Sequence, residues 1–176
     1  MKSYSQAKQD LFVLEVLKNK RNGSFLDIGC SHPINISNTF LLESEFDWRG
    51  ISIDIDNTFS QEWKQRKKSK FINEDALSLN YKNILKEITS NNNIDYLSLD
   101  LEPASVTFEC LKILPFDDYI FSVITYEHDS YRFGDIYQKQ STEFLTNLGY
   151  VLIEKDVTNE GYKFEDWYVH NSLISI

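Results

Sequence analysis

Five acidic residues each stand at or just after the end of a short apolar run, and they are Asp27, Asp54, Asp75, Asp100 and Glu127. In an open α/β sheet, parallel strands end at one edge, and ligands bind beyond these carboxyl ends. Residues that end consecutive strands therefore come together, and five carboxylates at one edge form an electronegative crevice. Such a crevice suits a ligand with hydroxyl groups to be held and positive charge to be neutralised.

The loop after the first of these runs, "DIGCSHPINISNT", contains a single glycine, Gly29. A dinucleotide fingerprint needs three spaced glycines. Pyrophosphate is bound by glycine-rich backbone donors at a helix N-terminus, without neighbouring carboxylates. The missing glycines and the surplus of carboxylates therefore favour a cationic nucleoside over a dinucleotide.

Apolar periodicity predicts helices and strands in alternation. Helices are expected at about 5–20 and at 37–46, 58–68, 81–93, 103–114 and 136–149, and strands at 24–29, 48–56, 70–76, 94–100, 118–129, 150–157 and 165–171. Strands separated by helices imply right-handed crossovers and a parallel sheet covered on both faces. The last two strands are joined by a short turn and should pair antiparallel. The predicted fold is α/β, a Rossmann-like three-layer sandwich with a mostly parallel seven-stranded sheet and a C-terminal antiparallel hairpin.

Length and composition narrow the class of protein. A chain of 176 residues with 41% hydrophobic residues predicts one globular domain, 1–176. The net charge of −9 argues against nucleic acid as the principal partner. No apolar run approaches the roughly 20 residues of a membrane span. The start lacks the apolar core of a signal peptide, and Cys30 and Cys110 form no disulfide framework, so a cytoplasmic location is expected. The basic cluster Lys64–Lys70 is expected to be the solvated face and end of the helix at 58–68.

Four segments carry a resemblance to a known family. The segments "DIGCSHPINISNTFLLE" and "WRGISIDID", with "YSQAKQDLFVL" before them and "DYLSLDLE" after them, resemble the FkbM-like branch of class I S-adenosylmethionine-dependent methyltransferases. The resemblance extends from Tyr4 to about His170. This chain departs from the family pattern at Cys30, where relatives usually carry Ala, and at Pro103, where Gly commonly follows the acidic pair. The departure at Pro103 changes how the chain enters the helix expected at 103–114, near the reaction centre.

The resemblance implies S-adenosylmethionine as the cofactor and assigns residues to its parts. The loop after Asp27 would approach the amino-acid end, Asp54 would bind both ribose hydroxyls, Asp75 would lie by the adenine, and Asp100 would lie nearest the sulfonium. The cofactor-binding residues expected are Gln6, Asp27, Gly29, Cys30, Ser31, His32, Asn38, Asp54, Ile55, Asp75, Ala76 and Asp100.

Several of these residues have an alternative interpretation. Asp56 lies on the same strand face as Asp54 and competes for the ribose. Asp27 could be only a helix or loop cap. His32 could be a loop histidine whose hydrogen bonds are satisfied within the loop. Asp75 could simply open the next loop. The polar residues at the start of the first helix, Gln6, Gln9 and Asp10, could be exposed instead of lining the pocket.

A hydroxyl that accepts a methyl group must lose its proton, which a base poised near neutral pH removes best. The candidates are Asp100, Glu102, Glu127 and His128, of which we favour His128, for its ordinary pKa, or Asp100. The three carboxylates could instead hold magnesium or manganese. Carboxylates on adjacent strand ends are commoner without metal, so no metal ligand is assigned.

The sequence therefore predicts an O-methyltransferase acting on a hydroxyl of a sugar, glycan or small molecule. Seven strands and their helices leave little chain for a lid, so we expect an open acceptor site. Such a site suits a glycan end, or completion by the second subunit of a homodimer. The alternative is a catalytically inactive methyltransferase-fold module that binds a partner protein, against which the clustered carboxylates argue, because like charges in one site are costly. A nucleotide-sugar or NAD enzyme is disfavoured by the missing glycines.

Overall fold

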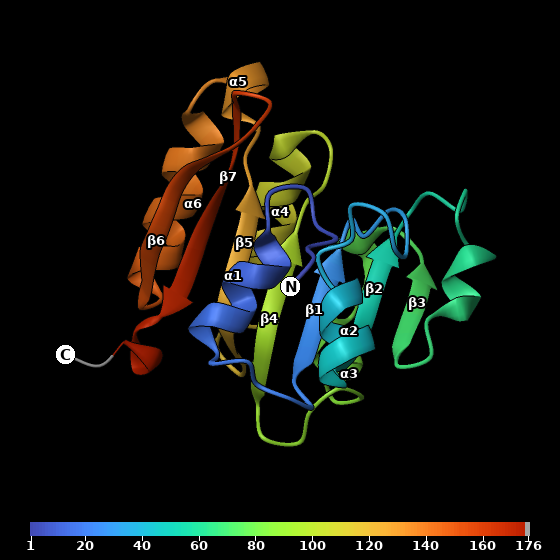
Figure 1. Cartoon of the computed structure of the whole chain (residues 1–176). Coiled ribbons are helices and arrows are strands. Elements are labelled where there is room, and N and C mark those ends of the chain that lie inside the picture. The colour runs from blue at the N-terminus through green and yellow to red at the C-terminus, as the bar shows by residue number, and fades with distance from the viewer. Residues whose placement is uncertain (175–176) are drawn as a thin grey trace.

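The seven strands form one sheet in the order β3-β2-β1-β4-β5-β7-β6 in the computed structural model, which describes residues 1–174 (Figure 1). The strands are β1 (Ser24–Ile28), β2 (Arg49–Asp54), β3 (Ser69–Asn73), β4 (Asn93–Leu99), β5 (Ile120–Glu127), β6 (Tyr150–Asn159) and β7 (Tyr162–His170). The first five are parallel, and β7 is antiparallel to both β5 and β6. The predicted fold class is confirmed, including the C-terminal hairpin. The strand order reverses at β1, which lies between β2 and β4.

Helices cover both faces of the sheet. They are α1 (Gln9–Val16), α2 (Phe40–Phe46), α3 (Tyr81–Leu85), α4 (Ala104–Ile113), α5 (Ser130–Phe133) and α6 (Ile136–Asn147). Helix α1 is shorter than the expected range of about 5–20, because Lys8 before it and Lys18 after it take left-handed backbone conformations. Within residues 1–174, no helix is both long and apolar enough to cross a bilayer.

Alternate residues of each strand contribute to two different apolar cores. Phe25, Tyr96 and Val123 face α1 and α2, which supply Val13, Leu14, Leu41 and Leu42. Leu26, Leu97 and Ile124 face the other way, toward α3, α4 and α6. Because both faces are covered, the strands read as nearly continuous apolar runs, which made their prediction possible.

The helix expected at 58–68 is absent, and this prediction is wrong. The segment forms one turn of 3-10 helix, Glu62–Gln65, and then continues in extended backbone at Arg66. Trp63 and Arg66 are both buried, while Lys64, Lys67 and Lys68 are exposed. The cluster is therefore no solvated helix face, since its arginine points into the protein.

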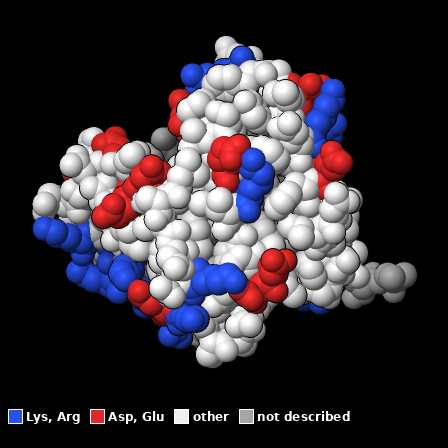
Figure 2. Space-filling model, turned by 180° about the vertical axis from the view of Figure 1, so that it is seen from behind, with Lys and Arg blue, Asp and Glu red and all other residues white. Residues whose placement is uncertain are grey.

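The lysines of this segment lie next to β3, an edge strand of the sheet. In Figure 2 basic side chains gather on the side of the molecule where β3 lies. Lys68 pairs with Asp47, and Lys70 pairs with Glu87 at 2.7 Å, all four side chains being about half exposed. Charged side chains on an edge strand discourage pairing with another chain.

Candidate active site

The backbone at the ends of β1 and β4 passes unusually close, and Gly29 makes this possible. Gly29 has φ +80°, and a Cβ placed on it would lie 1.5 Å from the carbonyl oxygen of Asp100. Its N–H donates to the carbonyl of Ile53 on β2 at 2.8 Å. Glycine at this position is therefore required by the packing of three strand ends, and Asp100 is held directly beside the loop after β1.

Asp54 ends β2 and faces that loop. Its Oδ2 accepts the N–H of Ser31 at 2.8 Å, and its Oδ1 accepts the N–H of Asp56 at 2.9 Å. Each carboxylate oxygen retains a lone pair that can accept a hydroxyl proton. The rival residue, Asp56, is exposed and accepts the N–H and hydroxyl of Thr58 instead. Asp54 is thus the carboxylate placed beside the β1–α2 loop.

Two other predicted residues serve the loop. His32 accepts the N–H groups of Ile34 and Asn35 on its Nδ1, both at 3.0 Å. Asp27 is only 2% exposed and accepts the hydroxyl of Thr39 at 2.8 Å, and burial raises its pKa. Both side chains therefore match the alternative reading of internal loop contacts. The thiol of Cys30 is also buried, and burial raises its pKa well above the usual value.

The remaining cofactor candidates are spread along the neighbouring edge. Asp75 caps the short 3-10 helix Ala76–Ser78 by accepting the N–H of Leu77 at 2.9 Å, and Ala76 is buried. Ile55, directly after Asp54, is 70% exposed. Asn38 donates to the hydroxyl of Ser98 at 3.0 Å, while its Oδ1 is buried without a partner among the described residues.

A cavity of about 270 Å³ opens beside Asp100. Its charged lining residues are acidic, and aromatic side chains complete the wall. Three of the predicted catalytic residues, Asp100, Glu102 and Glu127, lie here together with Gln6, whereas Asp54 does not. The lining residues are Gln6, Asp100, Glu102, Glu127, Asp129, Tyr131, Asn159, Tyr162 and Phe164.

Three carboxyl groups stand side by side across β4, β5 and β7. Leu99 pairs with Tyr126, which brings Asp100 next to Glu127, and Glu127 pairs with Glu165. Glu165 accepts Gln9 Nε2 at 2.9 Å and Trp167 Nε1 at 2.5 Å. We call Asp100, Glu127 and Glu165 the carboxyl row.

Burial and mutual repulsion keep protons on the carboxyl row. Burial and the charge of Asp100 raise the pKa of Glu127 far above its usual range, so this pair of neighbouring carboxyl groups holds a proton near neutral pH. Burial also raises the pKa of Asp100, and it raises that of Glu165 to about 8. The pKa of Asp100 is raised less than that of Glu127, so Asp100 is the member of the pair that ionises first.

Glu165 and Asp129 were not predicted as site residues. An antiparallel strand begins at the edge where its parallel neighbours end, so acidic residues near the start of β7 belong with those at the ends of β4 and β5. The antiparallel hairpin was predicted, and this signal could have identified Glu165.

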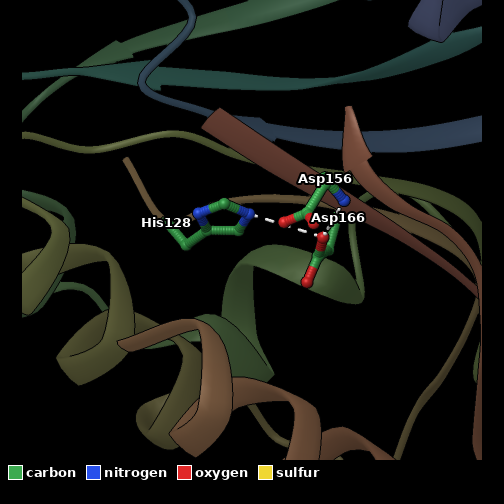
Figure 3. Close-up of side chains that lie close together, drawn as sticks. All are labelled: His128, Asp156 and Asp166. Carbon is green, nitrogen blue, oxygen red and sulfur yellow. Dashed lines mark hydrogen bonds and ion pairs between the residues drawn. The ribbon is translucent and has the colours of Figure 1, made fainter. Parts of the chain in front are cut away.

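His128 does not face the cavity. It is fully buried, and its Nε2 lies 3.4 Å from Asp166 Oδ1 (Figure 3). Its Nδ1 accepts the N–H of Ser130 at 3.0 Å. The expected role of His128 as the base that meets the acceptor is not supported by this placement, because residues alternate along β5 and its neighbours Glu127 and Asp129 line the cavity instead.

His128, Asp156 and Asp166 also form the kind of cluster that can hold a metal ion. The hydrogen bonds argue for a different role. A neutral imidazole that accepts at Nδ1 carries its proton on Nε2, which then has no lone pair for a metal. Gln138 Nε2 donates to both carboxylates, at 2.9 Å to Asp156 and at 3.0 Å to Asp166 Oδ2. We call these four side chains the hairpin clasp, because they join β5 and α6 to the β6–β7 hairpin.

Comparison with known proteins supports the fold. No family model matches the chain, and no curated protein matches it. An rRNA methylase from Streptococcus thermophilus has a similar structure, with TM-score 0.60 and 12% identity over 97% of this chain and 98% of that one. The N-methyltransferase NodS from Bradyrhizobium japonicum is also similar, with a TM-score of 0.57 and 12% sequence identity over 93% of this chain and 94% of that one.

A third similar structure contains bound S-adenosylmethionine. Magnesium protoporphyrin IX methyltransferase from Synechocystis PCC 6803, with bound S-adenosylmethionine, gives TM-score 0.61 and 13% identity over 94% of this chain and 79% of that one. At these identities the likeness establishes architecture alone. The chain has the Rossmann-like fold shared by these methyltransferases.

Proposed function

We propose that this chain is an S-adenosylmethionine-dependent methyltransferase that methylates a hydroxyl of a sugar, glycan or small molecule. The observation that carries the proposal is the arrangement of one sheet edge. Asp54 faces the β1–α2 loop, and the acidic cavity opens at the end of β4 on the same edge. Ligands of open α/β sheets bind at this edge, beside the reversal in strand order.

The residues present fit this cofactor. Asp54 is half-buried and has acceptor capacity left for two ribose hydroxyls, a charge-assisted contact. The exposed side chain of Ile55 follows it and offers apolar surface to a base. When bound, S-adenosylmethionine supplies an activated methyl group on a positively charged sulfur. The backbone of Asp100 lies against Gly29, and its carboxylate, in the wall of the acidic cavity, suits that charge.

Asp100 is the proposed general base. Its carboxylate lies in the wall of the cavity, and burial raises its pKa, which makes it a stronger base toward a hydroxyl proton than an exposed carboxylate. Glu127 lies beside Asp100 and, with its more strongly raised pKa, keeps its proton while Asp100 ionises. Much of the rest of the rate enhancement comes from holding the acceptor in line with the methyl group.

The cavity wall supports a hydroxylated acceptor. Carboxylates accept hydrogen bonds from hydroxyl groups. The rings of Tyr131 and Tyr162 lie 5.1 Å apart and are 48% and 56% exposed. Flat aromatic faces at the mouth of a polar cavity offer apolar surface to one side of a sugar ring. This combination fits the end of a glycan better than a fully apolar metabolite.

Methyl transfer to a panel of acceptors tests the proposal. Protein is incubated with S-adenosylmethionine carrying a deuterated methyl group and with sugars, oligosaccharides and small polyols, and mass spectrometry follows S-adenosylhomocysteine and labelled product. We expect acceptor-dependent S-adenosylhomocysteine and a labelled methyl ether, both reduced at least about a hundredfold in Asp100→Asn. Label on nitrogen would contradict the hydroxyl acceptor, and an inert protein that still binds the cofactor would favour the partner-binding module.

A further inference from the structure

The segment between β2 and β3 sends two buried side chains under the β1–α2 loop, residues 29–39. The first is Trp63, which is 3% exposed and stacks on Phe71 with ring centroids 5.1 Å apart. Its Nε1 donates to the carbonyl oxygen of Ser31 at 2.9 Å. Because the N–H of Ser31 donates to Asp54, Ser31 is held on both sides, by Asp54 and by Trp63.

The second side chain is Arg66, whose guanidinium donates hydrogen bonds to Pro33, Ser37 and Thr39 of the loop. It donates to the carbonyls of Pro33 at 2.7 Å and Thr39 at 3.3 Å. It also pairs with Glu43 at 2.6 Å and donates to the hydroxyl of Ser69 at 2.9 Å. One side chain thus connects the middle and end of the loop with α2 and β3.

The local electrostatics make this buried charge tolerable. Although burial alone would raise the pKa of Glu43, the charge of Arg66 and hydrogen bonds from Ser69 and Lys68 lower it. The guanidinium also lies 5.1 Å from the ring of Trp63 and 5.6 Å from that of Phe40. A planar fork that binds several acceptors while stacking on rings is a property of arginine that lysine lacks.

The loop needs external support, because its own backbone is strained. Ser31 has φ 45° and Ile36 has φ 54°, in the left-handed region that β-branched residues rarely adopt. Ile36 is 64% exposed, so its side chain provides little packing in return. Strained backbone persists where surrounding structure determines it, and such positions cluster at ligand sites.

We propose that Trp63 and Arg66 are positioning residues that hold the β1–α2 loop in its ligand-binding conformation. The proposal rests on the proposed function, since the ligand is taken to be S-adenosylmethionine or its product. Neither side chain is placed to touch the ligand. They act through Ser31, Pro33 and Thr39, and they keep the N–H of Ser31 on Asp54.

A pair of tryptophan variants tests the proposal. Trp63→Phe removes the indole donor to Ser31. The matched control is Trp48→Phe, because Trp48 is also buried and its Nε1 also donates to a backbone carbonyl, that of Lys20 at 2.8 Å, outside the loop. Calorimetry gives the affinity for S-adenosylhomocysteine, and amide NMR of Ser31 reports the loop directly. Arg66→Lys keeps the positive charge but loses the planar guanidinium with its several donors. It provides a second test if Trp63→Phe folds poorly.

We expect Trp63→Phe and Arg66→Lys to weaken binding by about tenfold or more and to shift the Ser31 amide signal, while Trp48→Phe leaves both within about twofold of the wild type. Equal affinities in the two tryptophan variants, or wild-type binding by Arg66→Lys, would overturn the inference. Failure of the wild type itself to bind would instead remove the proposed function. The wild-type and variant arms therefore separate the two claims.

Discussion

At the scale of single residues, the carboxyl row joins stability to the proposed chemistry. Asp100, Glu127 and Glu165 share one edge of three adjacent strands, and the charge of Asp100 makes the other two carboxyl groups harder to ionise. Clustered carboxyl groups lower stability once they are charged. Burial, together with the charges of Asp129, Asp27 and Glu102, raises the pKa of Asp100 and so makes it a stronger base.

This cost should appear as a pH dependence of folding. Burial first, and then the charge of Asp100, raise the pKa of Glu165 from 4.5 to about 8. The unfolded chain therefore releases this proton at a lower pH than the native protein does. The free energy of unfolding must then fall as the pH rises from about 5 to 8, by at most ~1.4 kcal/mol per pH unit for one group.

Urea denaturation of Glu165→Gln and the wild type at several pH values checks this dependence. We expect the free energy of unfolding to decline less steeply with pH in the variant, because glutamine at position 165 has no carboxyl proton to release. Glu154→Gln, on the exposed part of β6, is the control and should follow the wild type. Parallel curves for all three proteins would contradict the protonated row.

The contact at Gly29 gives a second residue-scale prediction. A Cβ there would meet the Asp100 carbonyl at 1.5 Å, whereas at Gly161, with φ +87°, nothing lies within 4 Å. Both substitutions with Ala incur the cost of a positive φ, roughly 1–2 kcal/mol. Gly29→Ala should lose about 2 kcal/mol more than Gly161→Ala in denaturant unfolding, because β1 and β4 must separate. Equal losses would contradict the close approach.

At the scale of elements, the strands could be predicted because burial on both faces gives each one a continuous apolar run between polar turns. Segment 58–68 could not be predicted in this way. Its charges suggested a helix surface, but the acceptors of Arg66 are carbonyls in a loop some thirty residues earlier in the chain. A local pattern does not contain the tertiary contact that decides the conformation.

The hairpin clasp carries a prediction about the β6–β7 hairpin. Asp166 accepts the N–H of Asp156 at 2.7 Å and the amide of Gln138, both away from free water. Asp166→Ala leaves these donors unsatisfied and should cost about 2–3 kcal/mol. We expect faster hydrogen exchange in β6 and β7 and little change in β1 and β2.

Asp135→Ala is the control for the clasp, because the Asp135–Lys139 pair is exposed and contributes at most about 1 kcal/mol. Melting curves with added zinc or manganese give a further check. The two carboxylates of the clasp are satisfied by protein donors, so neither ion should raise the melting temperature. A metal-dependent rise that is lost in Asp166→Ala would contradict this account of the clasp.

At the scale of the whole molecule, sequence reasoning predicted that acidic strand ends share one edge of the sheet, but it did not predict every residue at that edge. The carboxylates at the ends of β2, β4 and β5 were predicted because parallel strands end together. His128 was chosen for its ordinary pKa, but the structure places it on the face opposite the cavity. Side chains alternate along an extended chain, so Glu127 and His128 point in opposite directions, and this signal was available in the sequence.

The same scale explains why the cavity lies at the surface of the molecule. Most of the 176 residues build the sheet and its helices, and the cavity is walled by strand ends, α5 and the β6–β7 turn. A site built in this way lies at the surface, with its tyrosines exposed. This geometry suits an acceptor that is itself part of a larger molecule.

The most direct measurement is calorimetric titration of S-adenosylmethionine and S-adenosylhomocysteine into the wild type, Asp54→Ala and Asp56→Ala. Asp54 is held against the β1–α2 loop, whereas Asp56 caps Thr58. We predict binding by the wild type and by Asp56→Ala, and a loss of about a hundredfold in Asp54→Ala, as expected for charged hydrogen bonds. Folded wild-type protein that binds neither compound would contradict the proposed function.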